Sequence, residues 1–150
     1  MSAPPSSTTT LPATEERRSA EAATSPLLTI SNETVRLYKN VIGRGPTKVR
    51  TVFADPDTLV ILLEDALTPA ERTLLGVGAH EQLREFRQAI QEALELAVRS
   101  LIERTLGRET RAFIAGIDPA QATAAHVITL EPAASNDSPG APASRNGTAR

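Results

Sequence analysis

The stretch KVRTVFADPDTLVILLE, residues 48–64, determines most of the architecture open to this chain. In its first half, Val49, Thr51 and Phe53 alternate with neighbours that would face the opposite way, as in a β-strand. Its second half is apolar without a break over residues 59–63, which is typical of a central strand buried on both faces. Asp55-Pro56-Asp57 between the halves favours a turn. We therefore expect an antiparallel hairpin with strands at 48–54 and 58–64.

A helix is expected before this hairpin, over residues 31–42. Ser31 is a candidate N-cap, and apolar residues recur behind it at helical spacing, at Val35, Tyr38, Val41 and Ile42. Gly43 can adopt the left-handed conformation that closes a helix, and Gly45-Pro46 prevents its continuation.

Two helices are expected after the hairpin. Thr68-Pro69-Ala70-Glu71 matches a capping box, in which the side chains of Thr68 and Glu71 each accept from the other residue's backbone N–H. This short helix should end at Gly76. The pattern is structural, so Glu71 is not expected to be an active-site acid. A long helix over 79–106 follows, with an apolar stripe of Leu83, Phe86, Ile90, Leu94, Ala97 and Leu101.

The length of this last helix has a consequence for assembly. At about 1.5 Å per residue it would span about 42 Å, whereas a seven-residue strand spans about 23 Å. One end should therefore overhang the sheet and bury its apolar residues against something else. The simplest partner is a second copy of the chain, through helix pairing or sheet extension, which predicts a homodimer.

Two further strands, at 110–116 and 124–130, complete the order α-β-β-α-α-β-β. Helices grouped around hairpins indicate an α+β fold, here a mostly antiparallel four-stranded sheet with helices packed on one face. Residues 27–131 therefore form a single domain. Residues 1–26 and 132–150 hold 7 of the 11 prolines and no aromatic residue, and we expect two disordered tails.

Composition excludes several classes of protein. The absence of cysteine excludes disulfides, thiolate metal sites and thiol catalysis. The formal net charge of −2 lacks the basic excess of a general nucleic-acid binder. The order of elements also resembles one arrangement of KH-type RNA-binding domains, but the matching junction, Gly76-Val77-Gly78-Ala79, has no basic residue after it. No stretch resembles a secretory signal or a membrane span, which predicts a cytoplasmic protein.

The one candidate binding site is basic. Between Arg36 and Arg50 the chain carries five positive residues and no negative one. Arg44 could hold a phosphate or carboxylate bidentately, and the glycines on either side allow close backbone approach. The alternative is a capped helix end whose basic residues complement the helix dipole. The predicted site for a small anion or a nucleotide consists of Gly43, Arg44, Gly45, Lys48 and Arg50.

No catalytic centre, metal site or cofactor is expected. His80 and His126 have no metal-ligand spacing around them, and a lone histidine in a strand is usually a packed or edge residue. The adjacent carboxylates Glu64 and Asp65 are interpreted as a solvated strand end.

Several segments together resemble the MpsC-like family over about residues 28–131. They match it in order and spacing: Ile30-Ser31-Asn32-Glu33, Gly43 to Arg50 (GRGPTKVR), Leu67 to Glu71 (LTPAE), Arg84 and Arg87, and Gly107-Arg108. The resemblance implies a small cytoplasmic bacterial protein associated with a sodium-translocating, membrane-potential-generating system, or with bicarbonate transport. It implies no known catalytic residue.

Two functions follow from this resemblance and from the residues. A chain without a membrane span cannot itself conduct sodium. The first function is therefore that of a non-enzymatic accessory or regulatory component, peripheral to a membrane ion or bicarbonate transport system. The second is that of a soluble regulatory module that binds a small anion or nucleotide at the Arg44 loop.

Overall fold

A computed structural model describes residues 25–133 of the chain. Its elements are α2 (Pro26–Ile42), β1 (Lys48–Asp55), β2 (Thr58–Glu64), α3 (Pro69–Gly76), α4 (His80–Leu106), β3 (Thr110–Asp118) and β4 (Thr123–Leu130). The predicted α+β order is confirmed. Residues 1–24 and 134–150, nearly all of the two predicted tails, lie outside the described residues.

The four strands form one antiparallel sheet in the order β1-β2-β4-β3. The two strands in the centre carry the core: Leu59, Ile61 and Leu63 of β2 are fully buried, as is Ile128 of β4. The edge strands β1 and β3 bury fewer of their side chains, because each has a neighbouring strand on one side only.

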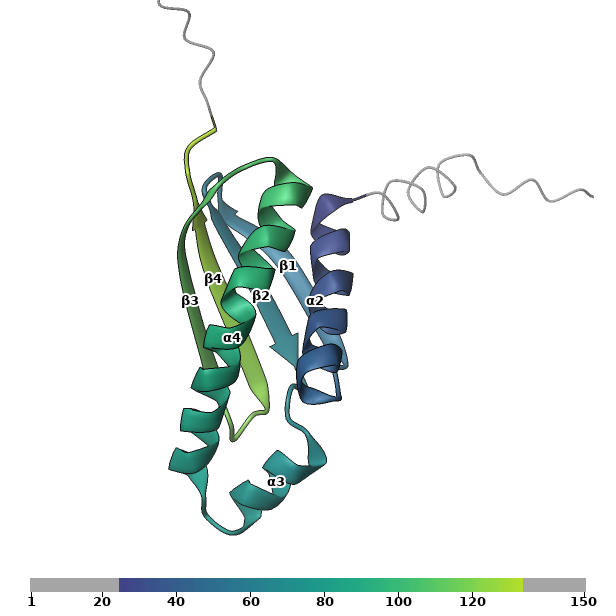
Figure 1. The fold of residues 1–150 in the computed structure, drawn as a ribbon, viewed down its shortest axis with the longest axis vertical. Coiled ribbons are helices and arrows are strands. Elements are labelled where there is room, and N and C mark those ends of the chain that lie inside the picture. Colours follow the sequence, from purple (N-terminus) through teal and green to yellow (C-terminus); the bar gives the residue numbers. More distant parts are fainter. Residues whose placement is uncertain (1–24, 134–150) are drawn as a thin grey trace, which may run out of the picture.

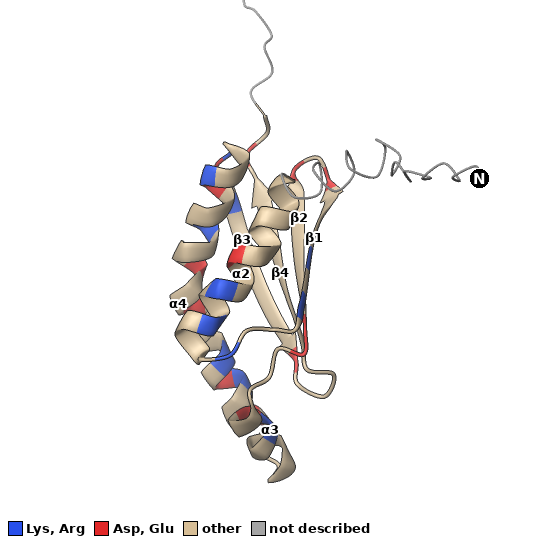
Figure 2. Cartoon of the chain, turned by 90° about the vertical axis from the view of Figure 1, so that its right-hand side faces the viewer, with Lys and Arg blue, Asp and Glu red and all other residues tan. Residues whose placement is uncertain are grey.

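Helices α2 and α4 cover one face of the sheet (Figure 1). Viewed from the side, both lie on the same side of the strands, and no described element lies on the other (Figure 2). The prediction that β2 is buried on both faces is therefore wrong. Its odd-numbered residues point into the core, whereas Val60 and Leu62 are only half-buried on the opposite face, because strand side chains alternate.

Helix α2 begins earlier than predicted. Its N-cap is Ser25, and Pro26 occupies the first helical position, where its missing N–H costs nothing. Ser31 is therefore not a cap but a buried residue of the helix interior. Its hydroxyl donates to the Leu27 carbonyl at 3.1 Å and lies 2.8 Å from the Thr51 hydroxyl of β1. The predicted closure at Gly43 is confirmed, with a left-handed φ of 87°.

Helix α4 overhangs the sheet at its N-terminal end, and α3 packs beside this overhang (Figure 1). The predicted stripe is wrong at one step: Phe86 is 46% exposed, and the buried positions next to it are Arg87 and Gln91. A charged side chain can replace an apolar one here because α3 supplies its counter-ion, Glu71. Helix α3 thus buries part of the overhang within the chain, whereas Phe86 stays at the surface.

Candidate functional site

The predicted anion-binding residues surround the end of β2. Arg44 forms an ion pair with Asp65, with 2.7 Å between Nη2 and Oδ2, and also donates to the Leu67 carbonyl. Asp65 accepts from Arg72 of α3 as well. We call these groups, with those of the next paragraph, the β2-end cluster.

The neighbouring carboxylate completes the β2-end cluster. Lys48 Nζ lies 3.4 Å from Glu64 Oε2, and Arg50 Nη2 lies 3.3 Å from Glu64 Oε1. Four cations thus share two carboxylates, and an excess of two positive charges remains. Glu64 and Asp65 lie at the end of β2 and are about one third exposed, as a strand end in contact with solvent would be, and each is in addition paired with two cations. Sequence reasoning missed Arg72, because it comes from a different helix.

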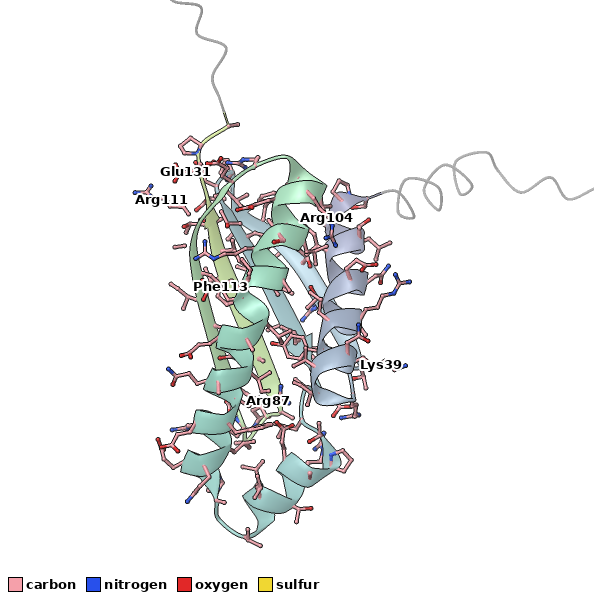
Figure 3. The ribbon with its side chains drawn as sticks, in the orientation of Figure 1. Lys39, Arg87, Arg104, Arg111, Phe113 and Glu131 are labelled. Carbon is pink, nitrogen blue, oxygen red and sulfur yellow. The ribbon has the colours of Figure 1, made fainter. Side chains whose placement is uncertain are left out.

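Two further observations describe this cluster. The hydrogen bond from Arg44 is the main reason that the pKa of Asp65 lies below its usual range, so the carboxylate stays charged at neutral pH. A Cβ atom on Gly45 would lie 2.9 Å from both Cγ1 and the carbonyl oxygen of Val35, so the missing side chain lets the loop pack against α2. Lys39, at the end of the same helix, points away from the domain (Figure 3).

A buried ion pair joins α3 to α4. Arg87 reaches from α4 to Glu71, with Nε to Oε1 at 2.5 Å and Nη2 to Oε2 at 2.7 Å, and both side chains are almost fully buried (Figure 3). Arg87 also donates to the Ala66 carbonyl. The Glu71 carboxylate closes the capping box by accepting from the Thr68 backbone N–H at 2.6 Å, which confirms that prediction. This pair positions the helices and leaves neither ion accessible to a substrate.

A second buried polar pair lies under the helices. The Tyr38 hydroxyl of α2 and Nε2 of His126 in β4 are 2.6 Å apart, and the rings of Phe113 and His126 form a T-shaped pair with centroids 5.0 Å apart. Burial lowers the pKa of His126 to about 4 and raises the pKa of Tyr38 to about 12. Both groups are therefore neutral at physiological pH, so His126 is the packed strand histidine that the sequence predicts.

A shallow groove of about 450 Å³ separates α4 from β3. Its polar wall comes from α4 and its apolar wall from β3, where Phe113 lies between strand and helix (Figure 3). The polar wall carries one arginine and two glutamates, so it does not favour an anion. Nothing in the local sequence signals this groove. The residues that line it are Arg84, Gln88, Gln91, Glu92, Glu95, Phe113, Ala115, Gly116 and Ile117.

Two general properties of the described residues bear on function. Over residues 25–133, no three His, Asp or Glu side chains come close enough together to hold a metal ion. None of the helices in this part of the chain combines the length and hydropathy that crossing a bilayer requires.

The fold and the β2-end cluster define a two-layer α+β domain with a local excess of basic charge beside an acidic strand end. A family model described as Na+-translocating membrane potential-generating system (MpsC) matches residues 27–132, a span that contains all the described strands and nearly all of the described helical residues. The chain belongs to this family, as its resemblance predicts. No curated protein and no solved structure matched the chain.

Proposed function

We propose that this protein is a non-enzymatic accessory or regulatory component of a membrane ion or bicarbonate transport system. The observation that carries the proposal is the family match, which runs across the whole folded core and names a membrane-potential-generating system. The proposed location is the cytoplasm, peripheral to the membrane.

The state of the buried ionisable groups supports a role without catalysis. Glu71 is held by Arg87 and by the backbone of Thr68, and His126 is neutral and hydrogen-bonded to Tyr38. A general acid or base must reach the proton that it transfers. These groups are instead occupied by the packing of α2, α3 and α4.

The experiment combines a physiological and a physical readout. In the organism that produces the chain, its deletion is expected to lower the Na+-dependent membrane potential, measured with a potential-sensitive dye, and the full chain should restore it. Crosslinking before detergent extraction should then capture a protein with several membrane spans. An unchanged potential together with no captured membrane protein would overturn the proposal.

A second function is favoured by the charge imbalance of the β2-end cluster. Four cations around two carboxylates leave an excess of two positive charges, which favours a small anion or a nucleotide phosphate. Arg44 could bind such an anion by exchanging its carboxylate partner. Titration of the ¹⁵N-labelled chain with phosphate, bicarbonate or ATP should shift the amide signals of residues 43–50. Arg44→Gln should abolish these shifts, while Arg84→Gln, on the exposed side of α4, should keep them. No shift at millimolar ligand rules this function out.

The homodimer remains a proposal. Apolar side chains that no described element covers support it: on the sheet, Val52 is 52% exposed and Ile114 63%. Light scattering of the full chain over a concentration series tests it, because a mass equal to one chain at every concentration contradicts the dimer.

A further inference from the structure

The face of the sheet that points away from α2 and α4 is apolar, and we call it the open face. One row of side chains crosses all four strands on it, because Val52 pairs with Val60, Val60 with Val127, and Val127 with Ile114. Val52 is 52% exposed and Ile114 63%. No described element covers this row (Figure 2).

The next row continues the same pattern. Leu62 pairs with Ala125, which pairs with Gly116, so the centre of the open face carries no polar side chain in two successive rows. An antiparallel sheet with one solvated face normally alternates apolar residues inside with polar residues outside. The open face has instead the composition of a surface that is covered by a further layer.

Charged residues occupy the four corners of the open face. At one end, Lys48 and Arg50 lie on β1 and Asp118 lies on β3, at the register positions that face outward with Val52 and Ile114. Glu64 of β2 lies on the same face and pairs with both Lys48 and Arg50, so this corner keeps one net positive charge. At the other end, Asp55 lies on β1 and Arg111 on β3, and both line one shallow depression with Thr58 and Thr129. Asp55, Arg111 and Asp118 form no ion pair with any of residues 25–133.

This arrangement of signs is complementary to itself. Along each edge strand, and across each end of the sheet, a positive corner is followed by a negative one. A two-fold axis in the plane between two stacked sheets therefore places positive corners over negative ones, whether the axis runs along the strands or across them. We propose that the open face binds the open face of a second copy, forming a symmetric dimer with four sheet strands from each chain.

The area of the open face is compatible with a weak dimer. Four strands spaced about 4.8 Å apart, each about 23 Å long, give a flat footprint of roughly 450 Å² per copy. The two footprints together approach the lower bound of about 1,000 Å² for specific interfaces. Apolar side chains raise the accessible area above the flat value. We therefore expect an interface at the small end of the specific class, and a dimer that dissociates on dilution.

Sedimentation velocity of the full chain over a micromolar concentration series tests this interface. The wild type should change from 16.0 kDa to about twice that mass as concentration rises. Ile114→Glu and Val52→Glu should each raise the dimer dissociation constant at least about tenfold, because they bury a charge in the apolar row. Leu96→Glu and Val77→Glu are matched controls, since both residues are 75% exposed on other surfaces. The controls should leave the dimer unchanged, and circular dichroism checks that every variant is folded.

Charge exchange distinguishes the direction of the axis. Arg111→Glu should weaken the dimer in either case. Asp55→Arg should restore the Arg111→Glu dimer if the axis runs along the strands, and Asp118→Arg should restore it if the axis runs across them. Three results would overturn the proposal: a monomer at all concentrations, a dimer indifferent to Ile114→Glu and Val52→Glu, or a dimer lost through Leu96→Glu or Val77→Glu.

Discussion

At the scale of single residues, the Glu71 carboxylate connects three parts of the chain. It caps the start of α3, neutralises Arg87 of α4, and through Arg87 fixes the carbonyl of Ala66 after β2. Removing two ions from water costs several kcal/mol, which their attraction and hydrogen bonds roughly offset. The pair therefore contributes little net stability while both partners are present, but the loss of one partner strongly destabilises the fold.

Substitution of Arg87 tests how strongly the loss of one partner destabilises the fold. Arg87→Met should lower the free energy of unfolding by about 3–5 kcal/mol, because it leaves a buried carboxylate without a counter-ion. Arg84→Met, on the exposed side of the same helix, should change it by no more than about 0.5 kcal/mol. The measurement is urea denaturation at pH 7.

A double variant separates charge from packing in that prediction. Glu71→Gln removes the charge and can keep the capping contact with Thr68. Combined with Arg87→Met, it should recover part of the lost stability. A double variant no more stable than Arg87→Met alone would show that the charge of Glu71 is not the cause.

The buried histidine predicts a pH dependence of stability. The pKa of His126 falls from 6.5 to about 4 on folding, so between these values the unfolded chain binds a proton that the folded chain does not. Stability is therefore fully present above pH 6.5 and decreases as the pH falls toward 4, by up to about 3 kcal/mol.

Urea denaturation between pH 6.5 and 5 measures this dependence. Asp55, Asp65 and Glu103 have pKa values below their usual range, so their own contribution to the slope is small in this window and is shared by wild type and variants. His126→Gln, which keeps a hydrogen-bonding group for Tyr38 and does not titrate, should flatten the slope, and His80→Gln should not. Equal slopes for wild type and His126→Gln would refute the prediction.

At the scale of elements, the loop from α2 to β1 depends on two glycines for different reasons. Gly43 has a positive φ, and its N–H donates to the Lys39 carbonyl at 2.9 Å, which closes the helix. Gly45 lies against Val35, with no space for a Cβ atom. The loop that carries Arg44 is thereby pressed against α2 and held beside Asp65.

Alanine substitutions distinguish this close contact from a general effect of glycine. Gly45→Ala should lower the unfolding free energy by about 1–3 kcal/mol, because the new methyl group overpacks against Val35. Gly76→Ala is the matched control, since no atom lies within 4 Å of its Cβ position. The control should be neutral or slightly stabilising. Thermal denaturation of both variants checks this, and equal melting temperatures would contradict it.

At the scale of the whole molecule, Arg108 ties together the end of the domain opposite α3. It donates to the Pro56 carbonyl at 2.7 Å, to Asp57 Oδ1 at 2.5 Å and to the Glu131 carbonyl at 2.8 Å. The turn between β1 and β2, the connection from α4 to β3, and the end of β4 thus share one guanidinium.

Substitution of Arg108 should destabilise the turn between β1 and β2 more than the rest of the domain. Arg108→Gln should lower the unfolding free energy by about 1–3 kcal/mol, because several charge-assisted hydrogen bonds are lost. Amide exchange should also become faster in residues 55–58. Arg104→Gln, one turn earlier and exposed, should change stability by no more than about 0.5 kcal/mol. Unchanged amide exchange of residues 55–58 in Arg108→Gln would show that the turn does not depend on the hydrogen bonds of Arg108.

Much of the fold could be predicted because its signals are local. The strand hairpin, the Thr68 capping box and the glycine at position 43 each depend on residues within a few positions of one another. The start of α2 was mispredicted because Ser31 has the side chain of a cap, while its hydroxyl in fact bonds within the helix and to Thr51.

The candidate site was predictable only in part. The basic residues from Arg44 to Arg50 are visible as a cluster in the sequence, but their carboxylate partners and Arg72 come from other elements. Which positive charge has a partner depends on distances between elements, and no spacing along the chain encodes those distances.

The amino-acid sequence by itself therefore determined the class of fold, the order of its elements and the family, since these follow from periodicity, caps and motifs that neighbouring residues carry. Only the tertiary structure decided which face of the sheet stays uncovered, that Arg87 and not Phe86 enters the core, and how two carboxylates divide four cations. The physical reason is that burial and ion pairing depend on what lies opposite a side chain in space, and that is set by the packing of all elements at once.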